Sequence, residues 1–140
     1  MQRKIKLIYP EVKIPTKTYS LDAGYDCYLI EDLIVPAYSA IKFPLGFAIQ
    51  INPNEMLTIR SRSSAKLKGV SCAESTCDAG YTGQLHGFLI NHTSKDIFFS
   101  KGERVVQLVF VKIAESSTLV PGQLGDTERG SAAFGASGRF

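Results

Sequence analysis

The chain of 140 residues has no tryptophan, only three cysteines and only two histidines. Cys27, Cys72 and Cys77 are an odd number and lack the spacing of a metal site, so we expect reduced thiols. A disulfide that joins Cys72 to Cys77 across a short hairpin is the alternative. His86 and His92 have no obvious partners in the sequence, and we expect structural roles for both.

Long apolar runs and a strong charge imbalance are missing as well. The best apolar run, residues 105–111, is interrupted by Gln107 and is far shorter than the roughly 20 residues that span a bilayer. The N-terminus lacks the apolar segment of a signal peptide. A net charge of +3 suits a phosphate-rich small ligand but is too small for a nucleic-acid-binding surface. We therefore expect a cytoplasmic protein, or one in the host cell interior if it is viral, that binds neither membranes nor nucleic acid.

Hydrophobic residues make up 44% of the chain, and many of them follow the period-two pattern of strands. Within the long run 40–51, Pro44 and Gly46 predict a bulge or a sheet edge. Only residues 63–68 are expected to form a helical turn or two. Many short strands with regular turns predict an all-β, jelly-roll-like barrel with a single core. The expected strands cover residues 4–9, 32–35, 40–51, 56–59, 85–91, 97–99 and 104–113.

The C-terminal segment, residues 129–138, is small, polar and rich in glycine. Its glycines let backbone amides approach an anion closely, and the Arg129 guanidinium fits phosphate oxygens. Phe134 offers a flat apolar face that can cover a base. Two interpretations remain open: a mobile arm that closes over a nucleoside triphosphate, or a frayed C-terminus.

Two polar segments lie in the first half of the chain. Asp26 follows a glycine turn, where it can hold a metal-bound water, accept a hydrogen bond from an arginine or merely cap the turn. Arg62, Ser63 and Ser64 precede the expected helix and form a candidate anion site, because free amides at a helix N-terminus attract phosphate. The alternative for this second segment is a capped surface helix.

Two further polar segments follow. Residues 70–83 are expected to form a hairpin that leads to Asp78, with Tyr81 three residues on. A hairpin backbone can read a base edge, Asp78 can orient a water, and Tyr81 can lie beneath a sugar. The alternative is a turn rich in glycine, aspartate and serine. Gln107 lies inside an apolar strand and must pair with backbone or with a ligand.

These five segments, in this order and at these spacings, resemble the motifs of the trimeric deoxyuridine triphosphate nucleotidohydrolases, the dUTPases. The resemblance runs from Ala23 to Gly138. The family patterns AGYDL, RSG/S, IDxxYRG, GDRIAQL and RGxGGFGSTG resemble, in turn, residues 23–27, 62–64, 77–83, 102–108 and 129–138.

The resemblance implies a distorted jelly-roll β-barrel over residues 1–124 and a flexible C-terminal arm over residues 125–140. It also implies a homotrimer with shared active sites, in which the arm comes from a neighbour. The implied activity is hydrolysis of dUTP to dUMP and pyrophosphate by attack of water on the α-phosphorus. This reaction keeps uracil out of DNA and supplies dUMP for dTMP synthesis. Mg²⁺ held by the triphosphate is the implied cofactor.

The resemblance further implies residue roles. Asp78 would activate the attacking water, and Asp26 would reach the metal through water. Tyr81 would pack against deoxyribose and exclude a 2′-hydroxyl, while the hairpin backbone would read uracil and exclude a thymine methyl. The implied phosphate-binding residues are Arg62, Ser63, Ser64, Gln107, Arg129, Gly135 and Ser137. The implied base- and sugar-binding residues are Tyr81, Ser71, Cys72, Ser75, Thr76 and Phe134.

The chain departs from the family patterns at several positions. Thr82 replaces the arginine or glutamine of the third motif, Glu103 replaces an aspartate of the fourth, and Glu74 and Ser75 make a bulkier hairpin tip. In the arm, three alanines stand where the family has glycine or serine. If either of the two replaced glycines needs a positive φ, the alanine at that position costs roughly 1 kcal/mol, and we expect slower or weaker arm closure. These alanines are Ala132, Ala133 and Ala136.

Two rival functions follow from the same segments. The dCTP deaminases share the fold and an RSS motif but use a glutamate on the strand after the third motif, and residues 85–90 contain no acid. The other rival is a dUTPase-fold protein with weakened or lost catalysis that acts as a protein-binding regulator. The retained Asp78 and Tyr81 favour the enzyme.

Overall fold

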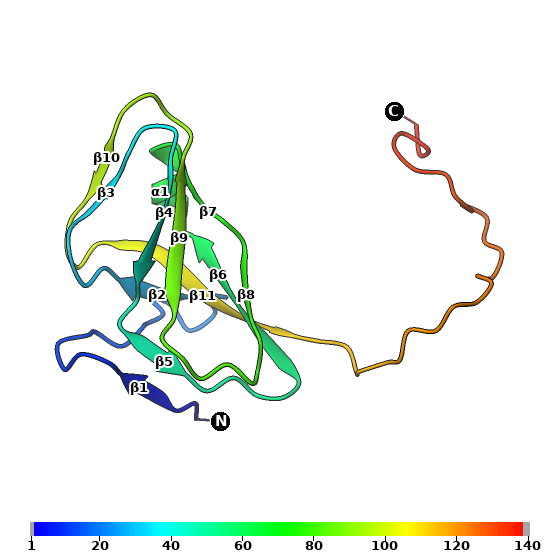
Figure 1. Cartoon of the computed structure of the whole chain (residues 1–140), viewed down its shortest axis with the longest axis horizontal. Coiled ribbons are helices and arrows are strands. Elements are labelled where there is room, and N and C mark those ends of the chain that lie inside the picture. The colour runs from blue at the N-terminus through cyan, green and yellow to red at the C-terminus, as the bar shows by residue number, and fades with distance from the viewer. Residues whose placement is uncertain (1, 139–140) are drawn as a thin grey trace.

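Short strands make up nearly all of the regular structure in the computed structural model, which describes residues 2–138 (Figure 1). The expected all-β class is confirmed, and the helix begins at the predicted residue. The strands are β1 (Ile5–Leu7), β2 (Tyr25–Tyr28), β3 (Leu33–Val35), β4 (Ala40–Pro44), β5 (Phe47–Ile49), β6 (Glu55–Ser61), β7 (Val70–Cys72), β8 (Ser75–Cys77), β9 (His86–Asn91), β10 (Ile97–Phe99) and β11 (Arg104–Lys112), and the helix is α1 (Ser63–Leu67). The described helix is too short to cross a membrane.

Two antiparallel sheets form the body of a distorted jelly-roll barrel. One has the order β2-β11-β6-β8 and the other the order β4-β9-β7. Two smaller sheets complete the body, β3 with β10 and β1 with β5, and Figure 1 shows them at opposite ends. The long strand β11 pairs with β2 on one edge and with β6 on the other, so it lies inside its sheet.

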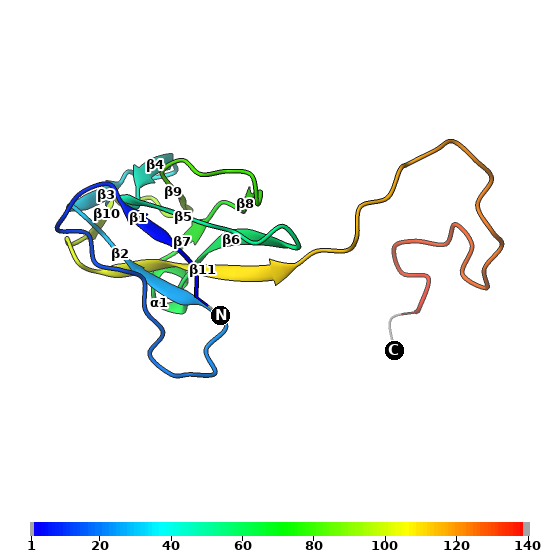
Figure 2. The same cartoon turned by 90° about the horizontal axis from the view of Figure 1, so that it is seen from below.

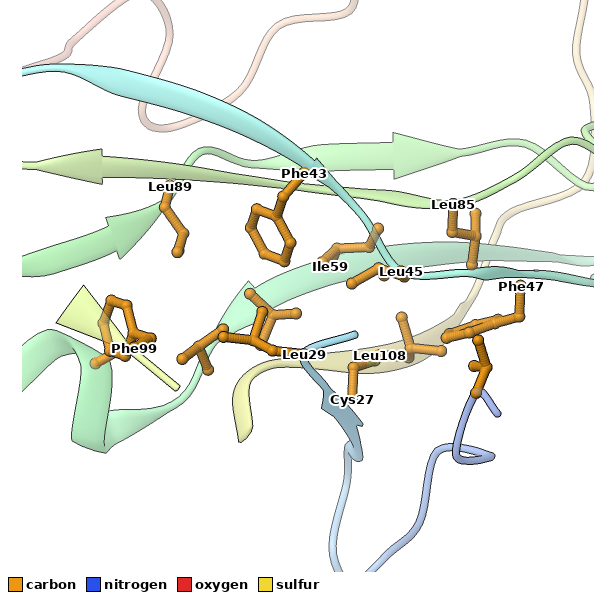
Figure 3. Packing of buried hydrophobic residues seen from close by; sticks show 14 of the residues in the cluster. Cys27, Leu29, Phe43, Leu45, Phe47, Ile59, Leu85, Leu89, Phe99 and Leu108 are labelled. Carbon is orange, nitrogen blue, oxygen red and sulfur yellow. The ribbon is translucent and has the colours of Figure 1, made fainter. Parts of the chain in front are cut away.

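The core lies between the sheets (Figure 3). Because side chains alternate along a strand, each sheet turns one set of apolar residues inward. Leu57, Leu89 and Leu108 are fully buried there. Cys27 is buried in the same cluster, and burial raises the pKa of its thiol. All three cysteines are free thiols, so the alternative of a Cys72–Cys77 disulfide is not realised.

The apolar run predicted over residues 40–51 is interrupted at the predicted position. β4 pairs with β9, whereas β5 pairs with β1. Between them Gly46 has a φ of +81°, and a β-carbon there would lie 2.6 Å from a methyl carbon of Val12. Glycine is therefore required where the chain passes from one sheet to the next.

The hairpin predicted over residues 70–83 does not form as expected. β7 pairs with β9, and β8 pairs with β6. Beyond β7, the Ala73 amide still donates to the Phe88 carbonyl of β9 at 3.0 Å. After Ala73 the chain crosses to the other sheet, so no ladder joins β7 to β8 among the described residues.

The C-terminal segment extends away from the body, as Figures 1 and 2 show. The Ile113 amide donates to the Asn54 carbonyl at 3.1 Å, and residues 112–138 are all exposed. Within the described arm, the hydrogen bonds of residues 127–138 join only neighbouring arm residues. The arm therefore has the geometry of a segment that can reach another molecule.

Candidate functional site

Three segments far apart in the sequence meet in a cavity of about 480 Å³, here named the Asp26 cavity. Asp26 comes from β2, Arg62 to Ser64 from the start of α1, and Arg104 and Gln107 from β11. Its lining residues are Thr18, Tyr19, Asp22, Ala23, Gly24, Asp26, Arg62, Ser63, Ser64, Arg104 and Gln107.

A β-bulge brings Arg104 and Gln107 to the same face of β11. In regular alternation, residues three apart point to opposite faces. The pairing with β2 shifts register between Arg104 and Val106, and both Val105 and Val106 are buried. The extra residue therefore leaves both polar side chains on the cavity side, with Gln107 directly opposite Asp26.

Asp26 joins two arginines at the base of this cavity. The residue is only 7% exposed. Its Oδ1 lies 2.7 Å from Nε of Arg62, and its Oδ2 lies 3.1 Å from Nη1 of Arg104. Of the roles left open by the sequence, the structure shows the arginine partner. The cavity lining holds two arginines and two aspartates, Asp22 and Asp26, so its formal charges balance. The two guanidinium groups are nevertheless donors that fit phosphate oxygens.

The start of α1 is held against the bulge in β11. The Arg62 amide donates to the Val105 carbonyl at 3.0 Å, and Ala65 is fully buried. Arg62 occupies the N-cap and makes no side-chain cap bond. The exposed hydroxyls of Ser63 and Ser64 face the cavity rather than capping the helix at that position.

Gly24 is the point of closest approach to Gln107. A β-carbon on Gly24 would overlap Oε1 of Gln107 and lie 2.8 Å from its Cδ. The φ of Gly24 is not in the left-handed region, so space and not backbone conformation requires this glycine. Because Gly24 has no side chain, the Gln107 amide group has room to lie at the cavity wall.

A second cavity of about 550 Å³, here named the Asp78 cavity, lies beside β8 and the start of β9. β8 is the edge strand of its sheet, and β7 covers β9 only from Phe88 onward. In the described part of the chain, no ladder fills the gap between them. The lining residues are Lys42, Ser75, Thr76, Cys77, Asp78, Tyr81, Gln84, Leu85, His86 and Phe88.

Asp78 and Tyr81 lie in one turn at this cavity. The Tyr81 amide donates to the Asp78 carbonyl at 3.0 Å, and the Tyr81 hydroxyl donates to the Gln84 carbonyl at 2.9 Å. A β-carbon on Gly83 would lie 2.7 Å from Cζ of Tyr81, so the ring rests on this glycine. Burial and then the charge of Asp78 raise the pKa of the adjacent Cys77 thiol. Asp78 itself is exposed and free to meet a ligand.

Two of the residues expected to bind the nucleobase and the sugar, Ser71 and Cys72, lie outside this cavity. Oγ of Ser71 is 2.7 Å from Nε2 of His92. The Cys72 thiol donates to the Ile59 carbonyl at 3.4 Å, and burial raises its pKa. The crossing after Ala73 separates them from Ser75 and Thr76, which do line the cavity.

The two cavities share no lining residue. The arm residues are apart from both: the Arg129 Nε donates to the Ala132 carbonyl at 2.9 Å, and Phe134 is fully exposed. Gly135 and Ser137 lie in the same curled segment, where Gly135 has a φ of +84°. One chain therefore carries three separate parts of the predicted site.

Sequence reasoning gave no site role to several residues of these cavities, among them Arg104, Lys42, Gln84 and His86. Arg104 is recognisable only once the strand register places it beside Asp26. Lys42, Gln84 and His86 line the Asp78 cavity because β4 and β9 pair, with Pro44 opposite His86. No short-range pattern in the sequence marks this pairing.

Comparison with known proteins gives matches along nearly the whole chain. A sequence model described as dUTPase matches residues 10–138. The deoxyuridine 5′-triphosphate nucleotidohydrolase of Kluyveromyces lactis is 32% identical over 139 residues, which cover 97% of this chain and 93% of that protein. The protein of the same name from Gloeothece citriformis is 33% identical over 141 residues, which cover 99% and 97%.

Solved structures of similar fold come from phages. A variant of the Staphylococcus bacteriophage 80alpha dUTPase with dUpNHpp has a TM-score of 0.88 at 23% identity and covers 99% of both chains. A variant dUTPase of phage phi11 of S. aureus, described with a structural Mg(II) ion, has a TM-score of 0.79 at 18% identity and covers 88% of this chain and 98% of that one. At these identities the likeness supports the fold.

Proposed function

Because this chain belongs to the dUTPase family, we propose that it hydrolyses dUTP to dUMP and pyrophosphate. The observation that carries the proposal is the pair of cavities with complementary chemistry. The Asp26 cavity has two guanidinium groups and two serine hydroxyls that can bind the oxygens of a triphosphate, and the Asp78 cavity has open strand edges beside a carboxylate and a tyrosine ring.

Uracil suits the gap between β8 and β9. Its edge presents an acceptor, a donor and an acceptor in a row, and strand edges present amide donors and carbonyl acceptors in alternation. Ser75, Thr76 and the start of β9 border this gap. A base with a different donor pattern would leave buried polar groups unpaired, so the site rejects it far more strongly than an apolar pocket would.

Tyr81 supplies the surface for the sugar. The ring rests on Gly83 and remains 45% exposed, which leaves ring surface open toward the cavity. A deoxyribose packed against it leaves no room for a 2′-hydroxyl. This arrangement favours dUTP over UTP.

Asp78 acts on the attacking water. Its carboxylate orients the water and accepts a proton while the water oxygen bonds to the α-phosphorus. The bond from the α-phosphorus to the bridging oxygen of the β-phosphate breaks, and pyrophosphate leaves. Arg62, Ser63, Ser64 and Gln107 hold the phosphate oxygens during this exchange.

Mg²⁺ fits the Asp26 cavity as an ion carried in by the triphosphate. Among the described residues, no group of three metal-ligating side chains exists. Asp26 offers hard oxygen atoms, and a carboxylate can accept a further bond from a metal-bound water while paired with both arginines. When bound, the ion neutralises phosphate charge.

The complete site is proposed to form in a homotrimer. The two cavities of one chain share no lining residue, and we propose that an Asp26 cavity of one chain meets an Asp78 cavity of a second. The arm of another chain would close this site with Arg129, Phe134, Gly135 and Ser137. Head-to-tail contacts of this kind close into a ring of three when the rotation between chains is 120°.

A pyrophosphate-release assay with dUTP tests the proposal, with the Asp78→Asn variant as the matched control. We expect turnover by the unchanged protein and a loss of orders of magnitude in the variant. Parallel reactions with dCTP, dTTP and UTP test the roles of the strand gap and of Tyr81. Absence of dUTP turnover by the unchanged protein would refute the proposed function.

A further inference from the structure

The Gln84 carbonyl accepts two hydrogen bonds at the Asp78 cavity. The Tyr81 hydroxyl donates to it at 2.9 Å, and Nδ1 of His86 lies 3.1 Å away. A carbonyl oxygen only accepts, so Nδ1 of His86 carries a proton. In its neutral form His86 is thus fixed as the Nδ1–H tautomer, which is the less common one for histidine in water.

This carbonyl is a fixed point of the structure. The next residue, Leu85, is 2% exposed and has both backbone groups bonded. Its amide donates to the Phe47 carbonyl at 2.9 Å, and its carbonyl accepts from the Leu45 amide at 2.9 Å. Tyr81 therefore attaches its hydroxyl to an immobile acceptor.

A carbonyl oxygen has two lone pairs, and here each has its own donor. While His86 occupies one lone pair, the Tyr81 hydroxyl is confined to the other. The direction of the Tyr81 ring is thereby set at its hydroxyl end, where the ring packs on Gly83 and the hydroxyl bonds the Gln84 carbonyl. Without His86, the hydroxyl could use either lone pair, and the ring would gain freedom to tilt.

We propose that His86 is a positioning residue, which aims the Tyr81 ring at the sugar and so sets the preference for deoxyribose over ribose. This inference rests on the proposed dUTP hydrolysis. His86 acts through the Gln84 carbonyl and leaves Asp78 untouched. Its loss therefore weakens substrate binding and sugar discrimination more than it slows the chemical step.

The kinetic test compares His86→Ala with His86→Asn, whose side-chain amide can donate in place of Nδ1–H. His92→Asn is the matched control, because His92 bonds Ser71 outside the cavity. We expect His86→Ala to raise KM for dUTP by about three- to tenfold and to lower the preference for dUTP over UTP by a similar factor. His86→Asn should recover most of both. Unchanged KM and preference in His86→Ala, or equal losses in both variants, would overturn the proposal.

A second measurement does not depend on turnover. The chain has only two histidines, so ¹⁵N chemical shifts of the imidazoles identify the His86 tautomer, with His92→Asn to assign the signals. Protonation at Nδ1 of neutral His86 is expected, and protonation at Nε2 would overturn the proposal. If the unchanged protein does not hydrolyse dUTP, the proposed function fails separately. Calorimetric affinities for a non-hydrolysable dUTP analogue and its ribose counterpart then decide the role of His86 by the same comparison.

Discussion

Replacing Gly24 with alanine adds one methyl group at the most crowded point of the Asp26 cavity. The new β-carbon would overlap Oε1 of Gln107, lie 2.8 Å from its Cδ and lie 3.2 Å from its Cβ. Because Gly24 has no left-handed φ, alanine causes no backbone strain there, and the whole effect comes from displacing Gln107. The colliding atoms are the far end of a flexible side chain beside a cavity, so the cost should not exceed about 1 kcal/mol, the low end of the range for overpacking in a core. For a domain of this size, that lowers Tm by about 4 °C for each kcal/mol.

A double-mutant cycle isolates this contact. Gln107→Ala removes the colliding amide, so Gly24→Ala should cost almost nothing in that background. Thermal unfolding of the four proteins measures the coupling, and KM for dUTP reports the displaced amide. Both single variants should raise KM, because each removes the Gln107 amide from the phosphate oxygens. An equal penalty for Gly24→Ala with and without the Gln107 side chain would show that Gln107 is not the group that the new methyl displaces.

Three further predictions follow from other contacts. Asn91 is 1% exposed, and its Nδ2 donates to the Val35 and Lys95 carbonyls at 2.9 and 2.7 Å. Asn91→Asp removes this donor and should lower the free energy of unfolding, measured by urea titration, by roughly 2–4 kcal/mol. Unchanged stability would contradict this role. Truncation before Arg129 should reduce turnover strongly. It should leave Tm unchanged, because the described arm makes its hydrogen bonds only within itself. Unchanged turnover would show that the arm is only a frayed C-terminus. A hydrogen bond from Arg3 holds the pKa of Glu55 below its ordinary value of 4.5, so the stability from this pair is present above that value and is lost as pH falls through the lowered pKa. Thermal unfolding of Glu55→Gln should show a smaller fall in Tm below pH 4.5 than the unchanged protein, and parallel curves would contradict this assignment.

Much of the fold could be predicted because period-two alternation is a local property. The strand patterns over residues 97–99 and 104–113 match β10 and, to within a residue, β11. Pairing partners are not local, and this explains the wrong hairpin. The alternation of residues 70–77 predicts strands, but it cannot tell that β7 joins β9 while β8 joins β6.

For the predicted site as well, local sequence patterns could be recognised, whereas residues placed by strand pairing could not. Segments with their chemistry contained in a few residues, such as Arg62 to Ser64, could be identified from the sequence. Arg104 and His86 could not, because a bulge in β11 and the pairing of β4 with β9 place them. The expected strain of the arm alanines is also absent from the described conformation, where the residues of positive φ in the arm are Gly130, Gly135 and Gly138.

We propose that a complete site needs the Asp78 cavity of one chain and the Asp26 cavity of another. Asp78→Asn and Arg62→Gln each remove one part, and Arg104 continues to pair with Asp26 in the second variant. Each variant alone should be nearly inactive toward dUTP. Unfolding and refolding the two together should restore a substantial fraction of turnover, because some interfaces then combine an intact Asp78 with an intact Arg62. A refolded mixture that is no more active than its separate components would contradict the shared site.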